Sequence, residues 1–301
     1  MPPLRNHRSR RPTLLVIGCG DVGLRVLKLL KGRYRILALT SSPERVAVLR
    51  HAGAVPLCGD LDDPASLGRL GALAELVLHL APPPAEGSRD SRTRNLLAAL
   101  ARGGRVGRIV YASTSGVYGD AGGARFDETR PLRPATARAR RRADAEAQLR
   151  AFGRRAGVVV SLLRVPGIYA SDRPGGHPRE RLERGAPVLR AEDDVYTNHI
   201  HADDLARACV SALHRARPQR PVHVSDDTEL RMGEYFDLAA DLCGLPRPPR
   251  LSRAEAAERL SPMQLSFMSE SRRLDNRRLK HELRLRLHYP TVLQGLRALP
   301  A

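Results

Sequence analysis

The chain has 301 residues, of which 42% are hydrophobic, as expected for a globular protein with a large buried core. No apolar run reaches the roughly 20 residues of a membrane-spanning helix, so we expect no membrane partner. The formal net charge is +19, but only three of the 51 basic residues are lysine. Because aromatic residues that could stack on bases are few and no nucleic-acid-binding motif is present, we attribute the arginine excess to composition and do not expect a nucleic-acid partner.

The cysteines and the first residues bear on location. Cys19, Cys58, Cys209 and Cys243 are scattered without metal-ligand spacing, which favours free thiols in a reducing compartment. Residues 1–12 are basic and proline-rich and lack the apolar segment of a secretory signal. We therefore expect a cytoplasmic protein with a short disordered basic tail.

Short apolar segments alternate with helical patterns through the first half of the chain, which is typical of a doubly wound parallel sheet. The predicted strands are Thr13–Ile17, Tyr34–Thr40, Ala54–Cys58, Glu75–Leu80, Val106–Ala112 and Val158–Leu163. The predicted helices between them are Val22–Leu30, Pro43–His51, Asp90–Ala101 and Thr136–Phe152. The pattern predicts an α/β domain of the Rossmann type at residues 13–165.

The pattern is less regular after Pro166. It contains a loop rich in glycine and proline (Ser171–Pro178), helices at Ala202–His214 and Met232–Cys243, and a strand at Val222–Val224. We expect residues 166–301 to form a smaller, C-terminal substrate lobe, with the strand near 222–224 returning to the main sheet.

A glycine motif lies where the first predicted strand meets the first helix. Gly18, Gly20 and Gly23 form G-x-G-x-x-G, and Asp21 and Val22 lie within it at the start of the helix. Such glycines permit a tight turn, a close approach of the backbone to a pyrophosphate, and close helix–strand packing. The free N–H groups at the helix N-terminus would bind the phosphates. The alternative is a glycine-rich turn that binds nothing.

The end of the second predicted strand bears on which dinucleotide would bind. An acidic residue there usually binds the 2′-hydroxyl of NAD. This chain has Thr40, Ser41 and Ser42 instead, followed by Arg45, a set that suits a 2′-phosphate and predicts NADP over NAD. Ser41 and Ser42 can also cap the next helix, and the two roles are compatible.

The fifth strand carries the most informative segment, Ile109 to Gly119, which delivers Ser113 and Thr114 to the carboxyl edge of the sheet. The segment resembles the strand with the catalytic Ser/Thr in the extended short-chain dehydrogenase/reductases, which include NAD(P)-dependent sugar-nucleotide epimerases and dehydratases. The resemblance assigns Ser113 to the cofactor site and Thr114 to the substrate-contacting position. It also implies that Asn95 belongs to the family's fourth helix and that two further segments border the cofactor: Gly59-Asp60-Leu61 and Leu80-Ala81-Pro82.

The resembling enzymes use a tyrosine, four residues before a lysine, for proton transfer. Matching Glu146 to the family's glutamate places Arg138 in the tyrosine position and Arg142 in the lysine position. No tyrosine or lysine occurs between Gly119 and Ile168, and an arginine cannot shuttle the proton because it stays charged. Three interpretations remain: a solvated basic helix face, a site for an anionic ligand, or an enzyme with another acid–base group.

Two tyrosines, Tyr118 and Tyr169, are candidates for that other group, although both match turn tyrosines of the family. In the second half, the element from Asn198 to Ala206 resembles the family's His-x-x-Asp-Asp-Leu-Ala. Its histidines, His199 and His201, have no third ligand near in sequence, so no metal is predicted.

The resemblance implies an NAD(P)-binding protein of the epimerase/dehydratase type. If it is an oxidoreductase or epimerase, it would move a hydride between nicotinamide C4 and a hydroxyl carbon of a small molecule such as a nucleotide sugar, with a degenerate Tyr/Lys site. The alternative is a non-catalytic dinucleotide-binding or redox-sensing protein. A monomer and a homodimer are both open, because the arginine run lies on a helix through which family members often dimerise.

Overall fold

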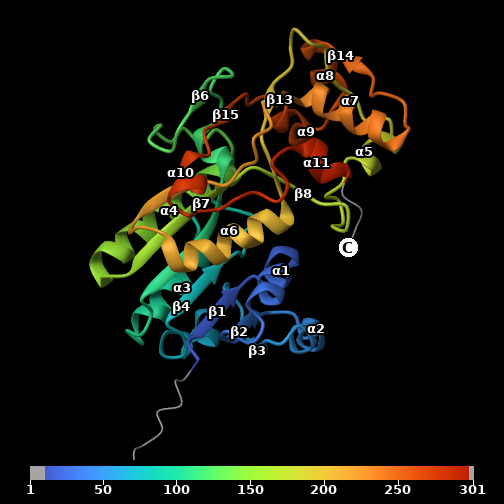
Figure 1. Cartoon of the computed structure of the whole chain (residues 1–301). Helices are drawn as coiled ribbons and strands as arrows, with labels where there is room; N and C mark the ends of the chain where they lie inside the picture. The colour runs from blue at the N-terminus through green and yellow to red at the C-terminus, as the bar shows by residue number, and fades with distance from the viewer. Residues whose placement is uncertain (1–10, 298–301) are drawn as a thin grey trace, which may run out of the picture.

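A sheet of seven parallel strands forms the centre of the computed structural model, which describes residues 11–297 (Figure 1). The strand order is β12-β7-β5-β4-β1-β2-β3. The chain therefore moves outward from β1 to β3 and then crosses back to β4, and an open sheet binds ligands at such a reversal. The strands are β1 (Thr13–Ile17), β2 (Arg35–Thr40), β3 (Val55–Cys58), β4 (Leu76–His79), β5 (Arg108–Thr114), β7 (Val159–Val165) and β12 (Arg220–His223). Residues 1–10 of the predicted basic tail lie outside the described residues.

Helices cover both faces of the sheet, as the uninterrupted apolar strands require. Leu14 and Val16 of β1 are buried with α1 (Asp21–Leu30), α2 (Arg45–His51) and α6 (Ala202–Arg215). The alternate residues Leu15 and Ile17 are buried with α3 (Ser91–Ala101) and α4 (Ala137–Ala156). The predicted α/β class with a doubly wound parallel sheet is confirmed.

Side-chain caps fix the starts of α3 and α4. Asp90 accepts a hydrogen bond from Thr93 N, and Thr136 accepts one from Ala139 N. Each cap satisfies an N–H group that the first helical turn leaves free. Because α4 follows β5 and precedes β7 in a right-handed crossover, its N-terminus lies at the carboxyl edge of the sheet.

Three elements end two or more residues later than predicted. Strands β5 and β7 continue to Thr114 and Val165, because their parallel pairing extends through Ser113 and Arg164. Because Ser113 and Arg164 are polar, the sequence pattern placed the ends of the two strands before them. Helix α4 continues through Gly153, which is buried within it, to Ala156, and it ends at Gly157, which adopts the left-handed conformation.

Most of the chain after β7 packs in a second unit with its own apolar cluster (Figure 1). Strand β12 leaves this unit and pairs with β7 at the edge of the main sheet. The unit contains α5 (Arg179–Glu183), α7 (Met232–Cys243), α8 (Arg253–Arg259), α9 (Pro262–Phe267), α11 (Val292–Arg297) and the pairs β9 (Val188–Leu189) with β14 (Arg250–Leu251) and β10 (Tyr196–Thr197) with β13 (Leu230–Arg231).

Two pairs of short strands and one short helix connect the two units. Strand β8 (Gly167–Tyr169) pairs with β11 (His199–His201), and β6 (Arg125–Phe126) pairs with β15 (Arg273–Leu274). Helix α10 (Arg277–His281) packs on β12. Within the described part of the chain, every helix is too short or too polar to cross a membrane.

Asp226, just after β12, is expected to make stability depend on pH. It is buried, its Oδ2 has no hydrogen-bond partner among the described residues, and burial raises its pKa to about 8. The unfolded carboxyl has a pKa of about 3.9, so between these values only the folded protein keeps the proton. The free energy of unfolding should therefore fall as the pH rises from about 4 to 8.

The Asp226→Asn variant, which cannot ionise, tests this expectation. We expect it to be more stable than the wild type by several kcal/mol at pH 8, because each unit of the removed pKa shift is equivalent to about 1.4 kcal/mol. The gain should shrink as the pH falls. Urea unfolding between pH 5 and 8.5 measures it, and parallel curves for the two proteins would contradict the assignment.

Candidate functional site

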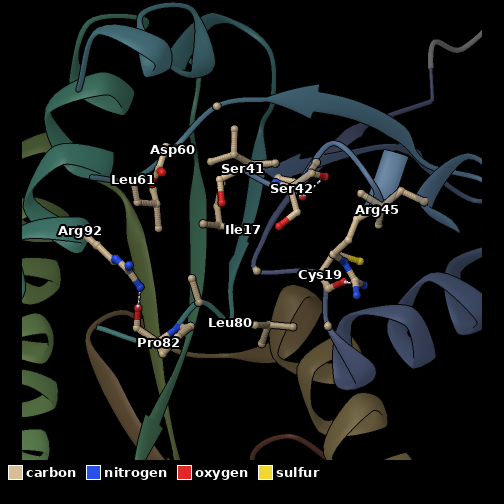
Figure 2. Close-up of a pocket in the computed structure, with 17 residues that line it drawn as sticks. Ile17, Cys19, Ser41, Ser42, Arg45, Asp60, Leu61, Leu80, Pro82 and Arg92 are labelled. Carbon is tan, nitrogen blue, oxygen red and sulfur yellow. Dashed lines mark hydrogen bonds between the residues drawn. The ribbon is translucent and has the colours of Figure 1, made fainter. Parts of the chain in front are cut away.

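A cavity of about 460 Å³ opens at the carboxyl edge of the sheet, where the chain order reverses (Figure 2). The loops that follow β1, β2, β3 and β4 supply most of its wall. The residues that line it are Ile17, Gly18, Cys19, Gly20, Leu39, Thr40, Ser41, Ser42, Arg45, Leu49, Gly59, Asp60, Leu61, Leu80, Ala81, Pro82 and Arg92. The structure thus brings together four segments that the sequence analysis had assigned to a cofactor site.

Four residues assigned to that site do not line the cavity. Asp21 turns away and accepts a hydrogen bond from Arg25 Nε, and Val22 packs against the core. A Cβ on Gly23 would lie 3.0 Å from Cys19 Sγ, so this glycine serves the packing of α1 on its own loop. Ser113 is buried beneath the carboxyl edge.

The glycine loop combines a tight turn with open space. Gly18 has φ +81°, and a Cβ there would lie 2.5 Å from the backbone nitrogen of Ala81, so only glycine fits. A Cβ on Gly20, by contrast, would meet nothing within 4 Å. No side chain caps α1 at Gly20, so its first N–H groups are available to a ligand. This combination fits a phosphate group.

The corner after β2 is polar and positively charged. Thr40 Oγ1 accepts a hydrogen bond from Ser42 N and donates one to Ser42 O, which closes a tight turn. Arg45, at the start of α2, donates from Nη2 to Cys19 O at 2.7 Å and so reaches across to the glycine loop (Figure 2). The acid among the cavity-lining residues is Asp60, which lies at the end of β3 and accepts a hydrogen bond from Asp62 N.

Arg92 on α3 lines the side of the cavity opposite Arg45 and was not predicted (Figure 2). It donates to both carboxylate oxygens of Asp62 and to Pro82 O. These hydrogen bonds raise the pKa of Arg92 and lower that of Asp62. Asn95, one turn later, donates from Nδ2 to Leu61 O at 2.8 Å and holds the loop after β3. No sequence pattern marks Arg92, because its partners come from two distant loops.

The hydroxyls at the end of β5 face different surroundings. Ser113 donates to Glu146 Oε1 at 2.7 Å inside the protein and does not line the cavity. Thr114 is half-buried, and its Oγ1 accepts a hydrogen bond from Gly116 N at 3.2 Å. Its hydroxyl hydrogen has no acceptor among the described residues, so Thr114 can donate to a ligand at this edge.

Tyr118 and Tyr169 face the core. The Tyr118 hydroxyl lies 2.6 Å from His223 Nε2 and accepts a hydrogen bond from Arg164. Burial raises the pKa of Tyr118 to about 12, and burial also raises the pKa of Tyr169. Both side chains are almost fully buried, so the geometry gives neither tyrosine access to a substrate at the carboxyl edge.

Arg142 and Arg138 occupy α4 above the end of β5. Arg142 is 8% exposed and donates from Nη1 to Tyr111 Oη at 3.0 Å and to Ala112 O at 2.7 Å. Arg138, one turn earlier, is exposed and has no hydrogen-bond or ion-pair partner within residues 11–297. Partial desolvation lowers the pKa of Arg138, and the charges of Arg142 and Arg141 lower it further. The Arg138 guanidinium nevertheless remains a cation at any working pH.

Similar structures extend over almost the whole chain. A functionally unknown conserved protein from Silicibacter pomeroyi is 31% identical, with a TM-score of 0.79 over 95% of this chain and 96% of that one. A UDP-glucose 4-epimerase from Thermotoga maritima, solved with UDP-glucose, is 20% identical, with a TM-score of 0.77 over 94% and 96%. A dTDP-glucose 4,6-dehydratase from Streptomyces venezuelae, with NAD bound, is 22% identical, with a TM-score of 0.75 over 94% and 95%.

The two enzymes, at their low identity, show the fold alone. A comparison with the curated proteins finds no match. The model of the NAD dependent epimerase/dehydratase family matches residues 14–225, which include the glycine loop, the end of β5 and all of α4. The chain belongs to the NAD dependent epimerase/dehydratase family.

Proposed function

We propose that this protein binds NADP(H) in the cavity at the carboxyl edge of the sheet. The observation that carries the proposal is the open space at Gly20, directly before a helix N-terminus that no side chain caps. We further propose that the protein is an oxidoreductase or epimerase whose proton transfer does not use the Tyr/Lys pair of resembling enzymes. Residues 166–301 would then form the substrate lobe.

The cavity-lining residues divide naturally among the parts of the dinucleotide. The backbone of Gly18 to Gly20 and the start of α1 would hold the pyrophosphate. Leu61 and Arg92 would border the adenine. Ser41, Ser42 and Arg45 would hold the 2′-phosphate, because hydroxyls and a guanidinium bind a phosphate well and no acid lines this corner.

The Arg45→Ala variant tests the preference for NADP. Wild-type protein should bind NADPH at least about tenfold more tightly than NADH, since a charge-assisted contact to phosphate contributes roughly 1.5–3 kcal/mol. Arg45→Ala should weaken NADPH binding about tenfold or more and leave NADH binding nearly unchanged. Fluorescence titration with each dinucleotide measures both affinities.

Arg50→Ala is the matched control, because Arg50 is an exposed arginine on the same helix and does not line the cavity. It should leave the NADPH/NADH ratio unchanged. Tighter binding of NADH by the wild type, or an equal effect of the two variants, would overturn the assignment of Arg45.

A bound nicotinamide would supply a hydride donor or acceptor at C4. The chain's own contribution would come from the ends of β4 and β5 and from the N-terminus of α4. Thr114 would donate its free hydroxyl hydrogen to a substrate oxygen and orient it. Arg138 can stabilise negative charge but cannot act as an acid or base. Substrates of the nucleotide-sugar type are proposed because the Thermotoga maritima relative was solved with UDP-glucose.

Hydride transfer and passive sensing make different predictions for Thr114. If the protein is an oxidoreductase, a substrate from a nucleotide-sugar panel should change the nicotinamide absorbance at 340 nm (roughly the absorption maximum of the reduced ring). Thr114→Ala should slow that change about 10²–10³-fold, the usual loss when one hydrogen-bond donor to a reacting oxygen is removed, while NADPH binding persists. NADPH binding with no absorbance change across the panel would favour the redox-sensing alternative.

A further inference from the structure

Arg138 stands at the top of the buried stripe of α4. Residues at helical spacing on this face, Arg142, Ala145 and Leu149, are all buried against the sheet. Arg138 continues the same stripe by one turn and is exposed, one turn before the first residue of the stripe that is buried. The neighbouring residue Ala139 shows that this turn of α4 lies at the end of β5. Its Cβ lies 3.9 Å from the position of a Cβ on Gly116, just beyond that strand.

Among the described residues, no acid forms an ion pair with the arginines of this turn, Arg138, Arg141 and Arg142. Arg141 and Arg142 are 7% and 8% exposed, and the Nε atom of each is buried without a hydrogen-bond partner in the described structure. Arg141 donates a hydrogen bond through Nη1 to Gly87 O, and Arg142 donates one to Ala112 O. Both acceptors are neutral backbone carbonyls. The buried acid of the same helix, Glu146, is already bound by Arg164 and Ser113.

Three neighbouring cations that form no ion pair within residues 11–297 are unfavourable. Like charges at helical spacing repel each other, and the repulsion strengthens where water is partly excluded. A bound anion would remove this cost, and a planar guanidinium with free N–H groups suits carboxylate or phosphate oxygens. The cluster therefore has both the charge and the free donors of an anion site.

The position of the cluster relates it to the proposed dinucleotide. Strand β5 is the second neighbour of β1 in the sheet, about 10 Å away at ordinary strand spacing. A dinucleotide whose phosphates lie at the end of β1 would extend toward the ends of β4 and β5. An anion at Arg138 would therefore lie beside the reacting end of the cofactor and next to Thr114.

Building on the NADP(H) site proposed above, we propose that Arg138, supported by Arg142 and Arg141, binds an anionic group of the substrate. The substrate would thus carry a carboxylate or a phosphate close to the carbon that reacts. Arg138 occupies the position that the proton-transferring tyrosine has in the resembling enzymes. At this position, the arginine would bind a charged group of the substrate instead of transferring a proton.

Inorganic phosphate is the first probe, used on the full chain with saturating NADPH. Phosphate should raise the thermal unfolding midpoint of the wild type relative to chloride at equal ionic strength. The Arg138→Ala variant should lose at least half of this shift. Arg140→Ala is the matched control, because Arg140 is exposed on another face of α4 and its side chain donates a hydrogen bond to Ala135 O. It should keep the whole shift.

UDP-glucuronate and UDP-glucose distinguish the two kinds of anion, since they differ by one carboxylate. If the site binds a carboxylate, the wild type should bind UDP-glucuronate at least tenfold more tightly than UDP-glucose. The Arg138→Ala variant should then bind the two ligands with equal affinity. If the wild type binds both nucleotide sugars equally, and phosphate raises the unfolding midpoint only when Arg138 is present, the site binds a phosphate. Identical phosphate shifts and identical affinities in wild type and Arg138→Ala would overturn the proposal.

Two further readouts keep the outcomes separate. Without ligand, Arg138→Ala should unfold at or above the wild-type temperature, because it removes repulsion and breaks no hydrogen bond; a marked loss of stability would show a structural role and contradict the proposal. The phosphate experiment is repeated without NADPH. If NADPH fails to bind while the Arg138-dependent shift persists, the dinucleotide proposal fails and the anion site stands.

Discussion

Gly20→Asp is expected to weaken NADPH binding at least about 100-fold without unfolding the protein. Gly20 has a negative φ (−83°), and a Cβ there meets nothing within 4 Å, so the new side chain fits without a steric collision. The carboxylate would cap α1 by accepting its free N–H groups. It would also repel the pyrophosphate, and the loss of several charge-assisted hydrogen bonds accounts for the size of the effect. Fluorescence titration with NADPH measures it.

Two neighbouring substitutions serve as controls. Gly20→Ala adds a methyl group without charge and should weaken NADPH binding much less than Gly20→Asp. Gly18→Ala should lose both binding and stability, because a Cβ there would collide with Ala81 N at a positive φ. Unchanged NADPH affinity in a folded Gly20→Asp protein would place the dinucleotide somewhere else.

Glu146→Gln is expected to cost about 3–5 kcal/mol of the free energy of unfolding. Glu146 and Arg164 are 1% and 2% exposed, and Arg164 Nη2 donates to Glu146 Oε2 at 2.7 Å. Burial opposes the charge on Arg164, but its hydrogen bonds to Glu146 raise the pKa of Arg164 overall. Neutralising Glu146 leaves the buried Arg164 cation without its counterion. This destabilises the protein more than replacing both charged residues with neutral ones would. Urea unfolding measures the loss.

Removing both charges tests the explanation. The double variant Glu146→Gln/Arg164→Met should lose less stability than the sum of the two single variants, because no unpaired charge remains. Asp241→Asn, which breaks the exposed pair with Arg247, should leave stability unchanged within error. Additive losses in the double variant would contradict a coupled buried pair.

The sequence allowed much of the fold to be predicted because its signals are local. The strands Thr13–Ile17 and Arg35–Thr40 each contain four consecutive apolar residues, and the φ of +81° at position 18 requires a glycine. Such features depend on neighbouring residues alone. The return of β12 to the main sheet was also expected, although its pairing with β7 depends on contacts about 60 residues apart in sequence.

The site was harder to predict wherever a side chain depends on a distant partner. Arg92 lines the cavity because Asp62 and Pro82 O hold it there, and no spacing reveals those contacts. Asp21 was assigned to the cofactor site by its place in the glycine motif, yet Arg25 draws its carboxylate to the other side of α1. The hydroxyl of Tyr118 forms hydrogen bonds with His223 and Arg164, which belong to two other strands. These contacts hold the tyrosine in the core, away from the carboxyl edge.

A structure of the protein in complex with NADP would locate every part of the dinucleotide at once. We predict the pyrophosphate on the backbone of Gly20 and the start of α1, and the 2′-phosphate within hydrogen-bond distance of Arg45. The nicotinamide should lie between the end of β4 and Thr114, with Arg138 directed toward the space beside its C4. A dinucleotide bound outside the cavity, or a nicotinamide site from which Arg138 points away into solvent, would contradict this description of the protein.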